Sequence, residues 1–217
     1  MASHYYYLAA QLPYLIYGQN IPMSSDAFRS LALEFMSTAD AAVLDSCTLD
    51  PDSPSVSADP DTGDEIAANP GAVGLGAASL GATYARPAKK TSSSLVNNWK
   101  KWERTLRLNL AKGRSLKFKR DGVSLAEAPE DPPDAASAAK TALLMDSPLE
   151  AELYLDKARW DVIESFQGVN NFHKNAIYAY LLKLLLMERR AAFNAEEGFS
   201  EYKRLYAAIL GEKNDRD

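Results

Sequence analysis

The sequence is poor in the side chains from which most catalytic and metal sites are built. Its 217 residues include one cysteine, Cys47, and two histidines, His4 and His173. A single cysteine cannot form an internal disulfide and is typical of a reducing cytoplasm. So few ligands exclude the common zinc and iron sites, and neither a histidine-based triad nor a thiol enzyme is predicted. We therefore expect a protein without a catalytic site, a metal or a cofactor.

Long apolar runs are missing as well. Although 47% of the residues are hydrophobic, no stretch approaches the roughly 18 apolar residues that a membrane span needs. The first residues lack the basic head and apolar run of a secretory signal. We expect a cytoplasmic protein that has a core of its own and no direct membrane span.

Basic residues are nearly absent from the first part of the chain. Residues 1–85 contain ten acidic side chains and one basic side chain, Arg29. Residues 86–120 then contain twelve basic side chains and a single acid, Glu103. The formal net charge of −5 therefore conceals a basic segment that lies between acidic ones.

Aromatic residues are scarce in two stretches, 51–94 and 121–140. Together these stretches hold 14 of the 22 proline and glycine residues but only one of the 21 aromatic residues, Tyr84. Such a composition buries too little apolar surface to offset the loss of chain entropy. We predict a single domain, 1–217, in which 51–94 and 121–140 are flexible insertions.

The remaining segments have helical periodicity. After an N-cap at Ser24 or Ser25, Phe28, Leu31 and Phe35 recur at helical spacing and predict a helix to about residue 38. No segment has the sustained alternation of a sheet, although the opening tyrosines are also compatible with a short strand. The fold class is therefore all-α, a helical bundle. Its parts are a helical region near 5–49, a basic helix near 95–112 that Gly113 is predicted to end or weaken, and a C-terminal bundle from 147 to 210.

The clearest helix start lies at Ser147-Pro148-Leu149-Glu150. An N-cap serine, a proline at the first position and a glutamate at the third satisfy the free amide groups of a first turn. This helix is predicted to end at Gly168 and to bury Leu149, Leu153, Trp160 and Ile163.

The next segment begins at Asn170 or Asn171 and is apolar on nearly every side, which indicates a central helix. His173 is interpreted as a packing or capping residue at its N-terminus rather than a ligand. A final helix carries Phe199 and Tyr202 and is predicted to end at Gly211.

Two stretches resemble ligand-binding motifs but lack residues that these motifs require. Residues 76–83 resemble a phosphate-binding loop, but alanine stands where the lysine belongs and no buried strand precedes it. The acidic stretch 59–65 does not match a calcium loop, because Asp64 occupies the position of the invariant glycine. Both are interpreted as linker.

The basic segment 86–120 has two interpretations. Basic side chains with Trp99 and Trp102 between them could contact nucleic acid, with phosphates bound to the cations and bases stacked on the rings. The two tryptophans also share an apolar stripe with Leu106 and Leu110, which favours burial in a helical core. The acidic flanks repel a polyanion, so nucleic acid is the less favoured partner and docking onto an acidic protein surface is the preferred one.

Three blocks of the chain resemble an uncharacterised bacterial family that is encoded inside V-type (A/V-type) ATPase operons. The opening resembles the start of that family, and the middle block resembles its Trp-Glu, Leu-Arg-Asn-Leu-Ala, Arg pattern, with Leu108 as an extra residue. The C-terminal block is also similar. The blocks are Tyr5–Pro13 with Pro22-Met23-Ser24, Trp102–Arg114, and Phe172–Phe199.

That family is in turn similar to the C (d) subunit of V/A-type ATPases, an all-helical socket between the rotor shaft and the membrane ring. The resemblance implies a non-catalytic coupling subunit whose partners are the central stalk and the membrane ring, located peripherally at the inner membrane through the complex. The alternative is a nucleic-acid-binding helical protein. The candidate interface residues are Trp102, Glu103, Arg104, Arg107, Arg114, Arg189 and Arg190.

Arg107 and Arg114 have a second interpretation that is equally open. Their guanidinium groups could pair with acids of the C-terminal bundle while their stems pack on it. Glu103 and Arg107 have the spacing of an ordinary i,i+4 ion pair.

Overall fold

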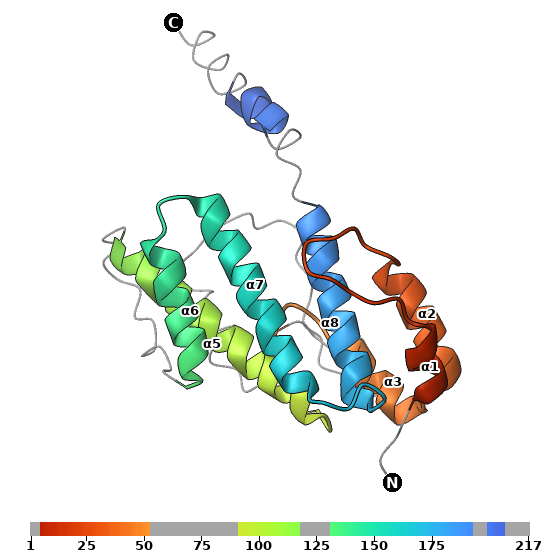
Figure 1. Ribbon diagram of the computed structural model, residues 1–217. Helices are drawn as coiled ribbons and strands as arrows, with labels where there is room; N and C mark the ends of the chain where they lie inside the picture. The colour runs from red at the N-terminus through yellow and green to blue at the C-terminus, as the bar shows by residue number, and fades with distance from the viewer. Residues whose placement is uncertain (1–4, 53–90, 118–130, 193–198, 207–217) are drawn as a thin grey trace, which may run out of the picture.

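A computed structural model describes residues 5–52, 91–117, 131–192 and 199–206 and shows an all-α fold in these ranges (Figure 1). Residues 199–206 are also helical. None of the described helices is long and apolar enough to cross a membrane. The labelled helices are α1 (Tyr6–Gln11), α2 (Ser25–Phe35), α3 (Thr38–Asp45), α5 (Ser94–Lys117), α6 (Pro133–Leu144), α7 (Pro148–Gln167) and α8 (Lys174–Ala191).

Helices α7 and α8 lie side by side in the middle of the bundle. On one side α5 and α6 pack against each other and against α7, and on the other side α2 and α3 pack against α8 (Figure 1). Helix α5 also reaches α8. The apolar character of α8 on nearly all sides follows from this central position.

The described N-terminal residues form helices joined by loops and contain no strand, so the alternative of a short strand is wrong. The opening tyrosines enter α1, and the helix that was predicted to reach residue 38 ends at Phe35. Ser37 then caps a separate helix, α3, because its hydroxyl oxygen accepts from the backbone nitrogen of Asp40. The N-cap of α2 is Ser24, one of the two predicted alternatives.

Helix α5 is longer than predicted, since it runs through Gly113 to Lys117. At Gly113 the side chain of Leu143 from α6 packs directly against the backbone of α5. A Cβ atom at this position would lie only 2.1 Å from Leu143 Cδ1. The glycine therefore marks a close contact between two helices and not a helix end.

The predicted insertion 121–140 is wrong from residue 133 onward, because this part forms the first turns of α6. The residues 121–130 and 53–90 lie outside the described ranges. The composition argument considered proline, glycine and aromatic residues, but here alanine lets α6 lie close to α5. Five alanines of α6 are buried, Ala136 and four that recur at helical spacing: Ala135, Ala138, Ala139 and Ala142.

The start and end of α7 are confirmed. Ser147 caps its N-terminus, and Gly168 follows its last residue with a φ of +76°, a conformation that glycine adopts at little cost. Trp160 and Ile163 are buried as predicted, whereas Leu149 and Leu153 are 66% and 38% exposed.

The capping role of His173 is confirmed. It is the N-cap of α8, and its Nδ1 accepts from the backbone nitrogen of Asn175 at 3.2 Å. Helix α8 therefore begins at Lys174, a few residues after the predicted start. The final predicted helix is described only over 199–206, where Phe199 and Tyr202 are exposed.

A buried carboxylate joins the N-terminal helices to α8. Asp40, which is 6% exposed, accepts from Tyr5 Oη at 2.6 Å, from Ser37 Oγ at 3.1 Å and from Lys174 Nζ at 3.2 Å. The hydroxyl of Tyr178 lies 3.3 Å from its Oδ1. Burial alone would raise the pKa of Asp40, but these hydrogen bonds and the Lys174 charge lower it to about 2.

We expect Ala139→Leu to destabilise the protein, because it inserts three carbon atoms where α6 meets α5. Overpacking of this kind costs about 1–3 kcal/mol. Ser137→Leu, at an exposed position of the same helix, is the matched control and should change little. Urea unfolding of both variants measures the difference, and equal stabilities would contradict the close packing of α6.

We expect acid to remove the stabilisation that Asp40 provides. A carboxylate whose pKa is lower in the folded state stabilises the fold above its unfolded pKa of 3.8 and ceases to do so as the pH falls toward 2. The loss amounts to about 2 kcal/mol. Unfolding experiments between about pH 5 and pH 2 should show a shallower decline for Asp40→Asn than for the wild type.

The matched control for that experiment is Asp26→Asn, which removes an exposed carboxylate from the first turn of α2. It should retain the pH dependence of the wild type. If Asp40→Asn has the same dependence as this control, another group carries the effect.

Candidate functional site

The seven candidate interface residues lie on two helices. Five of them belong to α5 and two to the last turn of α8, and these two helices meet inside the bundle. The structure brings three of them, Glu103, Arg107 and Arg189, into one chain of ion pairs, which we call the ion-pair chain. Its members are Arg107, Glu103, Arg159, Asp156 and Arg189.

Glu103 is the centre of the ion-pair chain. Its side chain is 1% exposed, and its Oε1 accepts from Arg107 Nε at 2.9 Å and from Arg159 Nη2 at 3.2 Å. Its Oε2 accepts from Arg159 Nε at 3.0 Å. The predicted i,i+4 pair with Arg107 is therefore confirmed, but Glu103 is also a buried link from α5 to α7.

Asp156 continues the chain from α7 to α8. Its Oδ1 accepts from Arg159 Nη1 at 3.1 Å and also pairs with Arg189. Its side chain is 5% exposed and that of Arg159 is 6% exposed. Two carboxylates and three guanidinium groups thus connect three helices through the interior.

The mutual pairing makes this burial tolerable. Burial alone would lower the pKa of Arg159, but the adjacent carboxylates of Glu103 and Asp156 hold it above its ordinary value. A buried ion pair is seldom a net gain over apolar packing, yet removal of one member leaves an unpaired buried charge and is costly. With both oxygens of Glu103 occupied by arginine donors, the cluster is arranged to hold helices together.

The basic helix finds acidic partners within its own chain. Arg107 Nη1 pairs with Asp50 at 2.9 Å and its Nη2 donates to the carbonyl oxygen of Leu49 at 2.9 Å. Arg104 pairs with Asp52. The acidic N-terminal segment therefore neutralises part of the basic one, although the two are about 50 residues apart in the sequence.

Trp102 is a core residue in this structure. It is 1% exposed, its Nε1 donates to Asp134 Oδ2 at 2.8 Å, and its ring stacks on that of Trp99 with centroids 6.1 Å apart. Burial of the stripe Trp99, Trp102, Leu106 and Leu110 is thereby confirmed. Neither Trp102 nor Glu103 offers surface to a partner, which separates these two from the other candidates.

Arg114 and Arg190 lie at the surface, apart from the ion-pair chain. The side chain of Arg114 is 57% exposed and pairs with Glu152 of α7 at 3.5 Å. Its partner is thus an acid of the C-terminal bundle, as one interpretation expected, whereas Arg107 pairs with acids from other parts of the chain. The guanidinium of Arg190 lies over the ring of Tyr17, 5.0 Å from its centroid.

Arg159 and Asp156 are the members of the ion-pair chain that the sequence interpretation missed. A signal for them exists. Asp156, Arg159, Trp160 and Ile163 share helical spacing, so the two charged residues fall on the apolar face of α7. Charges on such a face indicate buried partners on a neighbouring helix.

The remaining reactive groups do not gather into a site. Within the described ranges, no group of three or more histidine, cysteine, aspartate or glutamate residues is placed to hold a metal ion. Cys47 is completely buried, and burial raises the pKa of its thiol to about 12. The thiol therefore stays protonated and donates weakly to the Val43 carbonyl oxygen.

Comparison of the chain with protein families, with curated proteins and with solved structures found no match.

We expect Glu103→Gln to destabilise the protein by about 3–5 kcal/mol, because it leaves the Arg159 guanidinium without its main counter-charge in the interior. The matched control is Glu152→Gln, which breaks an ion pair whose members are 57% and 45% exposed. It should cost about 1 kcal/mol or less. Chemical unfolding measures both, and similar losses would mean that the ion-pair chain does not hold the helices together.

Proposed function

We propose that this chain is a non-catalytic accessory or coupling subunit of a bacterial V-type ATPase that links the rotor shaft and the membrane ring. The observation that carries the proposal is the resemblance of three sequence blocks to a family encoded in V-type ATPase operons. ATP chemistry then belongs to other chains of the complex. The protein is peripheral to the membrane and reaches it through its partners.

The contacts between the three blocks support the proposal. The backbone nitrogen of Ser25, directly after the N-terminal block, donates to Glu188 Oε1 of the C-terminal block at 2.6 Å. The backbone nitrogen of Tyr5 donates to the Phe172 carbonyl oxygen at 2.8 Å. The middle block joins them through Glu103 and the ion-pair chain. The described residues of the three blocks up to residue 192 thus belong to one folded body.

A mechanical role fits the way this body is built. A subunit that transmits torque must resist sliding of its helices, and directional ion pairs resist sliding better than apolar contacts do. The ion-pair chain crosses α5, α7 and α8, and the Asp40 cluster attaches the N-terminal helices to α8. Charged groups are thereby used to fix the relative positions of helices.

The alternative function, nucleic-acid binding through 86–120, has less support. Its stacking residues Trp99 and Trp102 are 0% and 1% exposed. Two of its central cations, Arg104 and Arg107, pair with the chain's own carboxylates. A phosphate backbone would have to displace those carboxylates before it could bind.

Co-purification tests the proposal. The tagged full-length chain, expressed with the products of the ATPase operon and purified in mild detergent at moderate salt, should recover central-stalk or membrane-ring subunits. Mass spectrometry of the eluate identifies them. We expect this recovery because a coupling subunit contacts both the central stalk and the membrane ring.

The control is a tagged helical protein of similar size and net charge in the same cells. If the tagged chain recovers no more ATPase subunits than this control, the proposal is wrong. A salt-dependent mobility shift with duplex or single-stranded nucleic acid would instead support the alternative.

A further inference from the structure

A surface hollow of about 360 Å³ lies where residues 17–21 cross α7 and α8. We call it the Arg190 hollow. Trp160, Leu186 and Met187 form its apolar floor and are between 3% and 6% exposed. Arg190, from the last turn of α8, lines the hollow and is half-buried.

The chain at the edge of this hollow is held in place. Tyr17 packs edge-to-face on Trp160, with ring centroids 5.6 Å apart, and its hydroxyl donates to the Leu153 carbonyl oxygen at 3.1 Å. Gly18 turns the chain with a φ of +84°. The hollow is therefore preformed, which lowers the entropic cost of binding.

The electrostatics of the hollow are one-sided. Within the described ranges, Arg190 is the arginine that has no described carboxylate within 4.0 Å, whereas each of the others forms an ion pair. Asp156, the acid that lines the hollow, is already paired with Arg159 and Arg189. Lys157 pairs with Asp161 and also lies near the Tyr17 ring. The Arg190 guanidinium, which lies over the Tyr17 ring and has no described carboxylate within 4.0 Å, thus borders an apolar floor.

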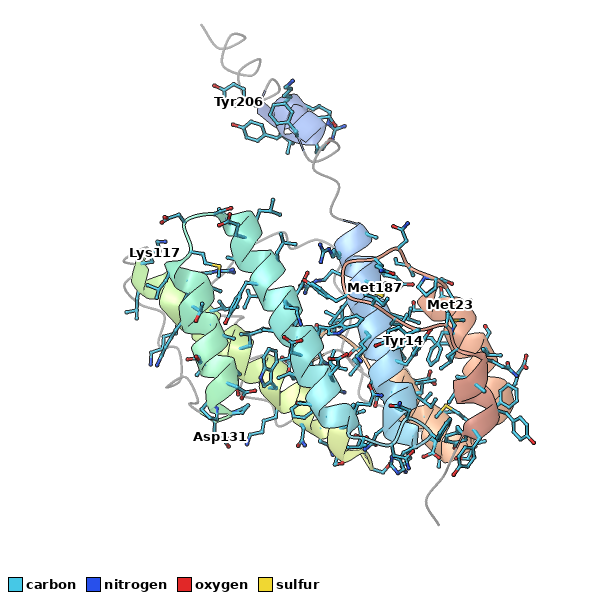
Figure 2. The ribbon with its side chains drawn as sticks, viewed as in Figure 1. Tyr14, Met23, Lys117, Asp131, Met187 and Tyr206 are labelled. Atoms are coloured by element: carbon cyan, nitrogen blue, oxygen red, sulfur yellow. The ribbon has the colours of Figure 1, made fainter. Side chains whose placement is uncertain are left out.

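Apolar side chains extend the surface along the chain that leads into the hollow. Leu15 is buried, and its neighbours Tyr14 and Ile16 point outward and are 85% and 43% exposed. Tyr14 lines a second hollow together with Ile177 and Tyr180 of α8, the helix that also carries Met187 (Figure 2). Tyrosine, tryptophan and arginine together are the residue types enriched at interface hot spots.

We propose that the Arg190 hollow is a docking site for an acidic amphipathic segment of a partner protein. An apolar side chain of the partner enters the hollow onto Met187 and Leu186, and a neighbouring carboxylate accepts from the Arg190 guanidinium. Charge complementarity selects this occupant, because the arginine carries the one uncompensated charge among the described groups of the hollow. The inference holds whether or not the partner belongs to the ATPase.

Fluorescence anisotropy with three labelled peptides of equal length tests the proposal on the full-length chain. One peptide combines leucine with glutamate, the second leucine with lysine, and the third serine with glutamate. The leucine–glutamate peptide should bind, and each of the others should bind at least about tenfold more weakly. If either control peptide binds as tightly as the leucine–glutamate peptide, or if the leucine–glutamate peptide does not bind, the proposal is wrong.

Variants locate the site. Arg190→Gln should weaken the leucine–glutamate peptide about tenfold, and Arg114→Gln, an exposed arginine of α5, should leave its binding unchanged. Equal effects would overturn the proposal, and the three-peptide comparison decides it if Arg190→Gln does not fold. If the wild type sediments as a dimer and Arg190→Gln as a monomer, a second copy of the chain occupies the hollow. That result would also contradict the proposal.

Discussion

Burial of the Glu103 carboxylate is the constraint on which the helical arrangement depends. An ionised group that is 1% exposed needs compensation from several donors, and here Arg107 and Arg159 supply it from two helices. Arg159 in turn requires Asp156, which also holds Arg189 of α8. The relative positions of α5, α7 and α8 are therefore specified by hydrogen-bond direction as well as by apolar packing.

Pairing within the chain also explains part of the charge segregation along the sequence. Acidic and basic segments suggested surfaces for separate partners, yet Asp50 and Asp52 pair with Arg107 and Arg104. Part of the segregated charge in the described residues is paired on folding, so these residues leave less surface charge for recognition than the sequence indicates. Arg190, which has no described carboxylate within 4.0 Å, stands out for this reason.

Local features were predictable where the cause is local. The capping box at Ser147, the stop at Gly168 and the capping role of His173 depend on a few neighbouring residues, and the structure confirms them. Predictions were wrong where a distant helix decides. Gly113 admits Leu143 instead of ending α5, and alanines let residues 133–140 pack as α6. Of the candidate interface residues, Trp102 and Glu103 are buried because α6 and α7 cover them.

The sequence by itself determined the all-α class, the apolar stripe of the basic helix and the principal helix ends, since periodicity and capping act within a few turns. Only the tertiary structure decided which charges are internal and which remain for a partner. The physical reason is that a charged side chain looks the same in the sequence whether its counter-ion is water, a partner or a residue more than 50 positions away, as Glu103 is from Arg159.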